Sequence, residues 1–241
     1  MSGRRIYLNI QHKLRTTLNP ALCLLCGTPV DSKAFLCTHC DASLQRVQRP
    51  CNLCGLPNRA TGPICPLCLH SPPRWNHMIA PLVFADTARE LILQFKFGQQ
   101  LPHVLALLTH LRPHYARYPV DALLPVPLHP QKRRERGYNQ AHEIARILSG
   151  LLTIPLDARS LQRVRATSSQ AGLSLDKRRR NLRGAFVFSP IRRYRSVAII
   201  DDIITSGSTM EEICKRLKKG GVERVEVWSL ARTLKQREAT S

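Results

Sequence analysis

The sequence has no apolar run long enough to cross a bilayer, which takes about 20 residues. Its first segment, from Met1 to Asn19, alternates basic and apolar side chains and lacks the continuous apolar core of a secretory signal. A membrane-spanning or secreted protein is therefore not expected. We expect a cytoplasmic protein, in a compartment that keeps thiols reduced and disfavours disulfides.

Acidic residues are scarce. The 241 residues include 16 Asp and Glu against 37 Lys and Arg, which gives a formal net charge of +21. This surplus favours anionic partners, with nucleic acid and nucleotides first and a membrane surface second. A solvated basic surface without a partner is the alternative. Aromatic residues are also few, at 5%, so base stacking has only modest support.

Cysteine shows the strongest pattern in the sequence. Eight of the nine cysteines form four Cys-x-x-Cys pairs, and adding 28 to the positions of the first two pairs gives the last two. The segment is therefore an internal repeat. Two thiolates in one tight turn can share a tetrahedral zinc, and two pairs complete a four-cysteine site. The candidate ligands are Cys23, Cys26, Cys37, Cys40, Cys51, Cys54, Cys65 and Cys68.

About two zinc ions are expected, and both should be structural because four cysteines leave no open coordination position. Sequential ligand sets, one metal per repeat, are the simplest arrangement. A cross-braced arrangement, in which pair one joins pair three and pair two joins pair four, stays open. Gly27 and Gly55 follow their pairs where a knuckle turn favours positive φ. Cys214 stands alone on a predicted helix and is expected to be a buried thiol.

Alternating helices and strands are expected after Pro72-Pro73, which indicates a linker. The predicted helices cover 85–97, 104–111, 140–151 and 209–219, and the predicted strands cover 122–126, 186–188, 197–200 and 225–230. This alternation predicts a parallel α/β sheet covered by helices on both faces. We expect two domains: residues 1–73 as a tail with a zinc module, and residues 74–241 as the α/β domain.

The stretch from Val197 to Thr209 carries the clearest chemical signal. An apolar strand leads to Asp201 and Asp202, and a hydroxyl-rich loop with one glycine, Gly207, then precedes a helix. Backbone N–H groups at a helix N-terminus can bind phosphate. The loop has no lysine, so it is not a Walker P-loop. Adjacent carboxylates suit a vicinal diol and hydrated Mg²⁺. A simple helix cap is the alternative, but it leaves the paired aspartates unexplained.

This stretch resembles the signature of type I phosphoribosyltransferases. The resemblance implies a twisted parallel sheet with helices on both faces, and a ligand such as phosphoribosyl pyrophosphate (PRPP) with Mg²⁺. It implies that Asp201 and Asp202 hold the ribose hydroxyls as the catalytic acids. Purine-salvage members often carry Asp at the position of Thr205, so a hypoxanthine-guanine enzyme is not expected. The residues implied in 5-phosphate binding are Thr205, Ser206, Gly207, Ser208 and Thr209.

Further segments look like the ComF/GntX family, which also carries an N-terminal double zinc ribbon. That resemblance implies a role in natural transformation and the handling of DNA in competent bacteria, or in the use of DNA as a nutrient. It makes DNA-uptake or helicase proteins possible partners. The segments are Pro125-Val-Pro-Leu-His-Pro130, Arg136-Gly-Tyr-Asn-Gln140, Thr167-Ser-Ser-Gln170, Arg178-Arg-Arg-Asn181 with Gly184-Ala-Phe186, and Val227-Trp-Ser-Leu-Ala-Arg232.

Basic residues concentrate between His129 and Arg195, where sixteen Lys and Arg face four acids. Type I folds hold pyrophosphate near the first basic run, and they carry a mobile loop near the run from Arg163 to Arg183. Arginine suits both pyrophosphate and a nucleic-acid backbone. The candidates for these ligands are Lys132, Arg133, Arg134, Arg136, Arg163, Arg165, Arg178, Arg179 and Arg180.

Three functions fit these observations. The first is a DNA-handling protein that binds PRPP or a nucleotide together with single-stranded DNA. The second is an enzyme that transfers a phosphoribosyl group from PRPP to an acceptor that the sequence does not name. The third is a PRPP sensor without catalysis. The intact pair Asp201 and Asp202 favours a ligand-competent site, and the charge favours nucleic acid.

Overall fold

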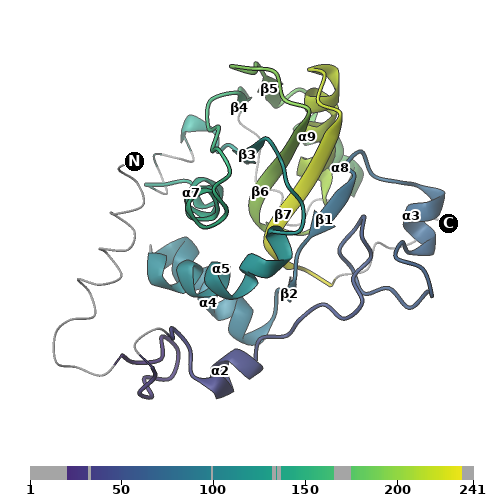
Figure 1. Cartoon of the computed structure of the whole chain (residues 1–241). Helices are drawn as coiled ribbons and strands as arrows, with labels where there is room; N and C mark the ends of the chain where they lie inside the picture. The colour runs from purple at the N-terminus through teal and green to yellow at the C-terminus, as the bar shows by residue number, and fades with distance from the viewer. Residues whose placement is uncertain are drawn as a thin grey trace.

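The computed structural model describes residues 21–31, 34–98, 100–131, 134, 137–165 and 175–234. Its centre is a parallel sheet in the order β1-β7-β6-β3, with β2 also paired to β7 (Figure 1). All of these pairs are parallel. The strands are β1 (His77–Ile79), β2 (Leu82–Val83), β3 (Ala122–Pro125), β6 (Ser196–Ile204) and β7 (Arg224–Arg232).

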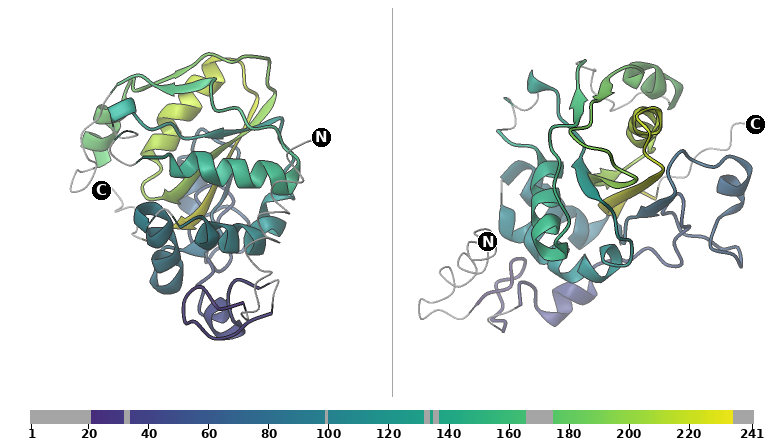
Figure 2. Two further views of the ribbon diagram at one scale, coloured as in Figure 1. Left: turned by 90° about the vertical axis from the view of Figure 1, so that its left-hand side faces the viewer. Right: turned by 45° about the horizontal axis from the view of Figure 1, so that its top comes forward.

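Helices cover both faces of this sheet, as the sequence predicted (Figure 2). Along β6, Ala198 and Ile200 pack into one hydrophobic core, while Val197 and Ile199 pack into the other. This alternation is expected of a strand that is buried on both faces. The helices of the first core are α4 (Asp86–Gly98), α5 (Leu101–Tyr115) and α7 (Gln140–Leu152), and the second core contains α9 (Ser208–Lys219), with α8 (Leu175–Leu182) beside it.

The predicted elements lie where the sequence put them, with longer bounds in several cases. The expected apolar face of α4 is confirmed, because its buried residues are Ala88, Leu91, Ile92 and Phe95. Cys214 on α9 is buried, as predicted. One strand departs from the main sheet. β5 (Phe186–Phe188) pairs antiparallel with β4 (Leu161–Arg163) in a separate two-stranded sheet.

The cysteine-rich segment is a structural repeat as well as a sequence repeat. Gly27 N–H donates to the carbonyl of Cys23, and Gly55 N–H donates to the carbonyl of Cys51. Both glycines have positive φ, at 70° and 68°, which confirms the predicted knuckle turns. Each unit also ends in a short helix, α2 (Thr38–Ala42) in the first and α3 (Pro66–His70) in the second.

The zinc module covers the sheet edge formed by β1 and β2. Val83 N–H donates to the carbonyl of Gln45 at 2.8 Å, and Val47 N–H donates to Pro81 at 2.8 Å. Met78 N–H of β1 donates to the carbonyl of Asn52 at 2.8 Å. An exposed strand edge invites pairing with other chains. The module therefore protects the edge and is tied by backbone hydrogen bonds to the α/β domain.

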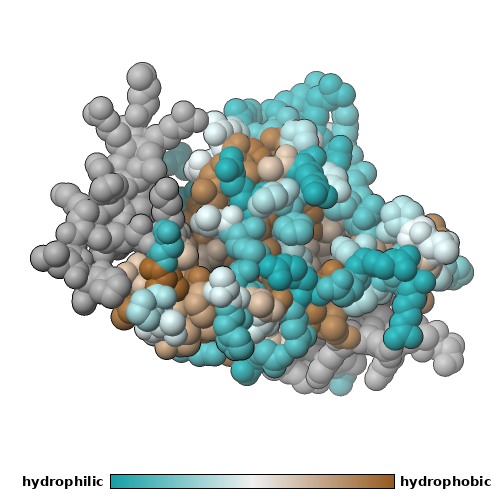
Figure 3. Space-filling model, turned by 60° about the horizontal axis from the view of Figure 1, so that its bottom comes forward, coloured by the Kyte–Doolittle hydropathy of each residue, from teal (hydrophilic) through white to brown (hydrophobic). Residues whose placement is uncertain are grey.

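Surface hydropathy is mixed rather than dominated by one apolar face. In the view of Figure 3, hydrophobic residues interrupt a surface that is mainly hydrophilic. Leu67 and Leu69 of α3 are among the exposed large apolar residues, at 53% and 68% exposure. Within the described part of the chain, every helix is too short or too polar to span a membrane.

Candidate functional site

The phosphate loop, defined as residues 205–209, joins the end of β6 to the start of α9. Gly207 is the N-cap of α9 and has φ 78° and ψ 0°, a left-handed conformation that favours glycine. The hydroxyl oxygens of Ser206 and Ser208 lie 2.9 Å apart. Thr205 is exposed, and Thr209 is partly exposed. The strand, the glycine turn and the helix N-terminus thus form the local structure that binds phosphate in many proteins.

The two acids lie inside β6, whereas the sequence placed them after the strand. The expected strand ended at Ile200, but backbone pairing with β7 continues to Ile204. Consecutive strand residues point to opposite faces, so Asp201 and Asp202 meet different neighbours. Asp202 N–H donates to the Asp201 carboxylate at 2.9 Å. Burial and the neighbouring Asp202 charge raise the pKa of Asp201 well above its ordinary value.

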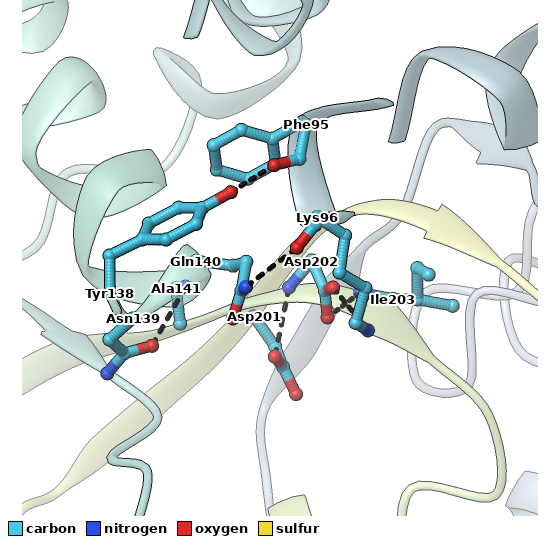
Figure 4. Close-up of polar contacts among 9 residues, drawn as sticks. All are labelled: Phe95, Lys96, Tyr138, Asn139, Gln140, Ala141, Asp201, Asp202 and Ile203. Atoms are coloured by element: carbon cyan, nitrogen blue, oxygen red, sulfur yellow. Dashed lines mark hydrogen bonds and ion pairs between the residues drawn. The ribbon is translucent and has the colours of Figure 1, made fainter. Parts of the chain in front are cut away.

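Lys96 is a site residue that sequence analysis missed. Its ammonium donates to Asp202 Oδ2 at 2.8 Å, and the two side chains are only 20% and 11% exposed (Figure 4). Lys96 lies at the C-terminal end of α4, more than a hundred residues before Asp202. Lys96 thus brings a positive charge from α4 to Asp202 on β6. The apolar pattern that predicted α4 gives no sign of this contact.

The segment Tyr138-Asn-Gln140 holds the end of α4 in place. Tyr138 Oη donates to the carbonyl of Phe95, and Gln140 Nε2 donates to the carbonyl of Lys96 at 3.3 Å (Figure 4). Asn139 caps α7 by accepting from Ala141 N–H at 3.1 Å. The last carbonyls of a helix need partners, and this segment provides them. It therefore positions the backbone of Lys96 beside the acids.

The eight cysteines form two compact sets, one in each repeat. Within each set the sulfurs lie within 4.8 Å of one another. Cys26 Sγ lies 3.7 Å from Cys37 Sγ, and Cys54 Sγ lies 3.8 Å from Cys65 Sγ. Tetrahedral zinc with bonds of about 2.3 Å separates its sulfurs by about 3.8 Å. The donors therefore fit zinc, and the grouping is sequential rather than cross-braced.

Among the described basic candidates, Arg163 and Arg165 have different neighbours. Arg163 of β4 lies over the Phe186 ring at 5.4 Å. Burial lowers the pKa of Arg163 below its ordinary value, and the charge of Asp201 opposes that shift. Arg165 instead donates to the carbonyls of Asn181 and Arg183 near the end of α8, at 2.7 and 2.6 Å. Arg134 and Arg180 are exposed.

The remaining basic candidates have no described side chain. Lys132, Arg133 and Arg136 lie outside the described residues. Arg178 and Arg179 lie in α8, but their side chains are not among those described. The run expected to be a mobile loop contains part of β4 and all of α8, while residues 166–174 fall outside the described chain.

An open cleft of about 540 Å³ adjoins the phosphate loop but does not contain the acid pair. Ser71 and Arg74 line one side, and Ser208, Glu211 and Lys215 line the other. Arg74 Nε pairs with Glu211 at 3.6 Å. The lining therefore carries both signs of charge, with Arg74 and Lys215 basic and Glu211 and Glu212 acidic.

Two family models match the chain. The phosphoribosyl transferase domain matches residues 135–241, and the double zinc ribbon domain matches residues 14–69. Among solved structures, a purine phosphoribosyltransferase from Pyrococcus horikoshii is 18% identical. It covers 53% of this chain and 81% of its own, with a TM-score of 0.35.

Two curated relatives extend over most of the chain. Competence protein F of Haemophilus influenzae is 37% identical over 87% of this chain and 96% of its own. DNA utilization protein YhgH of Escherichia coli K12 is 34% identical over 89% of this chain and 98% of its own. The two cysteine sets and the parallel sheet covered by helices agree with the two matched domain models. The chain therefore belongs to the ComF/GntX family, in which a double zinc ribbon precedes a phosphoribosyl transferase domain.

Proposed function

We propose that this protein binds the 5-phosphoribosyl group of PRPP or of a nucleotide, and that it handles single-stranded DNA during DNA uptake or use. One observation carries the first part. The loop after β6 presents a left-handed Gly207 at the N-terminus of α9, and two carboxylates precede it on the same strand. In this proposal Thr205 to Thr209 bind the 5-phosphate.

Asp201 and Asp202 bind the ribose hydroxyls in this proposal, and they hold the Mg²⁺ that accompanies PRPP. Oxygen donors are the ligands that Mg²⁺ prefers. The raised pKa of Asp201 reflects unfavourable negative charge in the ligand-free site. A cation relieves that repulsion, so the acid pair suits a hydrated Mg²⁺ that arrives with the pyrophosphate.

The DNA part rests on charge and on relatives. The chain carries +21, and its relatives include a competence protein and a DNA utilization protein. Arginine and lysine bind phosphate backbones without reading sequence. The proposed contacts are Lys132, Arg133, Arg134, Arg136, Arg163, Arg165 and Arg178 to Arg180. DNA-uptake or helicase proteins are the proposed protein partners.

The proposed compartment is the cytoplasm. None of the nine cysteines, all of which the structure describes, forms a disulfide, and eight of them are grouped as zinc ligands would be. Reduced thiols of this kind are typical of the cytosol.

Transfer of phosphoribosyl from PRPP to an acceptor is the second candidate function. The ion pair between Lys96 and Asp202 supports it, because both acids and a cation stand where this proposal places the ribose. Release of pyrophosphate from PRPP, measured with nucleobases and with DNA as acceptors, tests this candidate. Turnover with an acceptor would support it, and PRPP binding without turnover would favour the binding role.

A binding titration tests the proposed function directly. PRPP with Mg²⁺ and a single-stranded oligonucleotide are titrated separately and then together. We expect both to bind. Competition between them would indicate that DNA and PRPP share the site near the acids, and independent binding would place DNA elsewhere on the basic surface. Absence of PRPP binding would reject the phosphoribosyl part of the proposal, and absence of DNA binding would reject the DNA part.

A further inference from the structure

A buried arginine links the second zinc unit to the phosphate loop. Arg232, the last residue of β7, is 3% exposed. Its Nε donates to the carbonyl of Cys54 at 3.0 Å. Its Nη1 donates to the carbonyl of Ile204 at 2.8 Å and also to the carbonyl of Thr205. One guanidinium thus holds a zinc-ligand backbone and the start of the phosphate loop together.

Trp75 forms a second link between the same two parts. Its indole Nε1 donates to the carbonyl of Leu53 at 2.5 Å, inside the knuckle between Cys51 and Cys54. Its ring lies against Gly207, where an added Cβ would come within 3.2 Å of Cη2. Cys54, Cys68, Trp75, Gly207 and Arg232 surround one small gap between these groups. The left-handed glycine of the loop therefore rests on a ring that the knuckle holds.

The first zinc unit has different neighbours. Leu25 and Leu36 pack against the core that contains α4 and α5. Ser43 Oγ lies 2.7 Å from Thr87 Oγ1 of α4. The two units also occupy separate places in Figure 1, where α2 lies below α4 and α3 lies to the right of β1. The chain therefore contains a matched control for the second site.

The knuckle can offer these carbonyls only while it is folded. Small four-cysteine units fold with their metal, because the free energy of metal binding is also free energy of folding. Without the second zinc, the carbonyls of Leu53 and Cys54 lose their fixed positions. Arg232 and Trp75 would then no longer hold Ile204, Thr205 and Gly207 in place.

We propose that zinc at Cys51, Cys54, Cys65 and Cys68 fixes the phosphate loop in its ligand-binding conformation, with Arg232 and Trp75 as positioning residues, and that the first zinc site does not. This inference rests on the proposed function for the ligand it names, namely a phosphate ester. The coupling between metal and loop exists in the ligand-free protein, so it can be measured without any ligand.

Two cysteine-pair variants of the full chain test the coupling. Cys65→Ser with Cys68→Ser removes the second zinc, and Cys37→Ser with Cys40→Ser removes the first. Elemental analysis should show that each variant loses about one zinc. Hydrogen exchange of the amides at 205–209 should become about tenfold faster, or more, in the second-site variant. The first-site variant should leave that exchange unchanged.

Trp75→Phe keeps the ring beside Gly207 but removes the N–H that bonds to Leu53. We expect it to retain both zinc ions and still to speed exchange at 205–209. This variant keeps the test decisive if the cysteine variants misfold. Unchanged exchange in Trp75→Phe and in the second-site variant would overturn the proposal. Equal acceleration in both cysteine variants would also overturn it, because that result indicates general destabilisation.

PRPP calorimetry with Mg²⁺ separates the two proposals. If the zinc-loaded wild type binds PRPP, the second-site variant should bind about tenfold more weakly or worse, which is about 1.4 kcal/mol. The first-site variant should match wild type. If wild type binds no PRPP, the proposed function fails, and the hydrogen-exchange result alone decides whether the second zinc controls the loop.

Discussion

The Lys96 ammonium lies 2.8 Å from Asp202 Oδ2, in a contact where neither side chain is more than 20% exposed. Near the end of the helix that carries Lys96, the side chains of Tyr138 and Gln140 donate hydrogen bonds to the carbonyls of Phe95 and Lys96. A cation therefore stands beside the acid pair before any ligand arrives. Its role in the ligand-free protein is to offset the repulsion between Asp201 and Asp202.

Replacement of Lys96 by Met should lower the stability of the ligand-free protein. The change leaves the Asp202 carboxylate largely buried without its donor, and such a loss costs about 1–3 kcal/mol. Urea unfolding at about pH 7.5 measures the difference in the free energy of unfolding between the variant and wild type. Arg89→Met is the matched control, because Arg89 is exposed on the same helix. Equal effects of the two changes would contradict a special role for Lys96.

Because the pKa of Asp201 is raised, we predict that Asp201→Asn increases folding stability by an amount that depends on pH. A carboxyl group whose folded pKa exceeds its unfolded pKa stabilises the fold at low pH, and that contribution is lost as pH rises through the folded pKa. The asparagine variant should therefore become more stable than wild type as pH rises above the ordinary value of 3.8. Thermal unfolding across a pH series measures this difference.

Asp121 provides a control, because its pKa is shifted in the opposite direction from that of Asp201. Its carboxylate accepts from Ser196 N–H and Arg195 N–H at 2.8 Å each, and the bond from Ser196 is the main cause of its lowered pKa. A lowered pKa contributes stability above the ordinary value of 3.8, and that stability is lost as pH falls through the folded pKa. Asp121→Asn should therefore destabilise at neutral pH. The same sign for both variants would refute the electrostatic account of the acid pair.

Gly207→Ala should cost more stability than Gly221→Ala. Both glycines have left-handed φ, at 78° and 85°, and this conformation costs a non-glycine residue about 1–2 kcal/mol. Only Gly207 also meets a neighbour, because an added Cβ lies 3.2 Å from the Trp75 ring. Denaturant unfolding compares the two variants. Equal losses would show that the Trp75 contact imposes no packing constraint on the loop.

Single-stranded DNA should bind with strong salt dependence and little base preference. Each phosphate contact contributes about 0.7 to the slope of log affinity against log salt, so about five contacts give a slope near −3.5. Arg133→Ala with Arg134→Ala and Arg136→Ala should weaken binding and flatten the slope. Fluorescence anisotropy over a salt series measures both effects.

A control variant for the DNA-binding test removes three arginines that precede β6, so it loses the same charge at the other end of the sheet. Arg192, Arg193 and Arg195 are exposed and precede β6, whereas the phosphate loop follows it. Their replacement by Ala should change DNA affinity less than replacement of the first three arginines. Equal effects, or affinity that is flat with salt, would leave the basic segment as a solvated surface.

The sequence predicted the parts of this structure that depend on local pattern. The face of α4 followed from apolar spacing, and the knuckle glycines followed from the cysteine repeat. The end of β6 did not, because Asp201 and Asp202 interrupt the apolar pattern while backbone pairing with β7 continues. β1 and β2 were missed because they have only 3 and 2 residues and, unlike the Phe-Val-Phe run of β5, contain none of the aromatic residues Phe, Tyr and Trp.

The contacts around the site could not be predicted from the sequence for a different reason. Lys96 reaches Asp202 from a helix whose polar residues gave no sign of a partner. Arg232 joins Cys54 to Thr205 only because β7 lies between the zinc module and β6. The zinc ligand sets were ambiguous because both groupings satisfy the same spacing. Long-range packing decided the first two, about which local periodicity carries no information, and the fold of each repeat decided the third.

The most direct test of the central claim is calorimetric titration of PRPP and Mg²⁺ into wild type and into Asp201→Asn with Asp202→Asn. The claim is that the acids and the loop after β6 bind the phosphoribosyl group. We expect wild type to bind and the double variant, with its two zinc ions retained and its fold intact by circular dichroism, to show no measurable binding. Unchanged affinity in the folded double variant would contradict the claim and locate the ligand elsewhere.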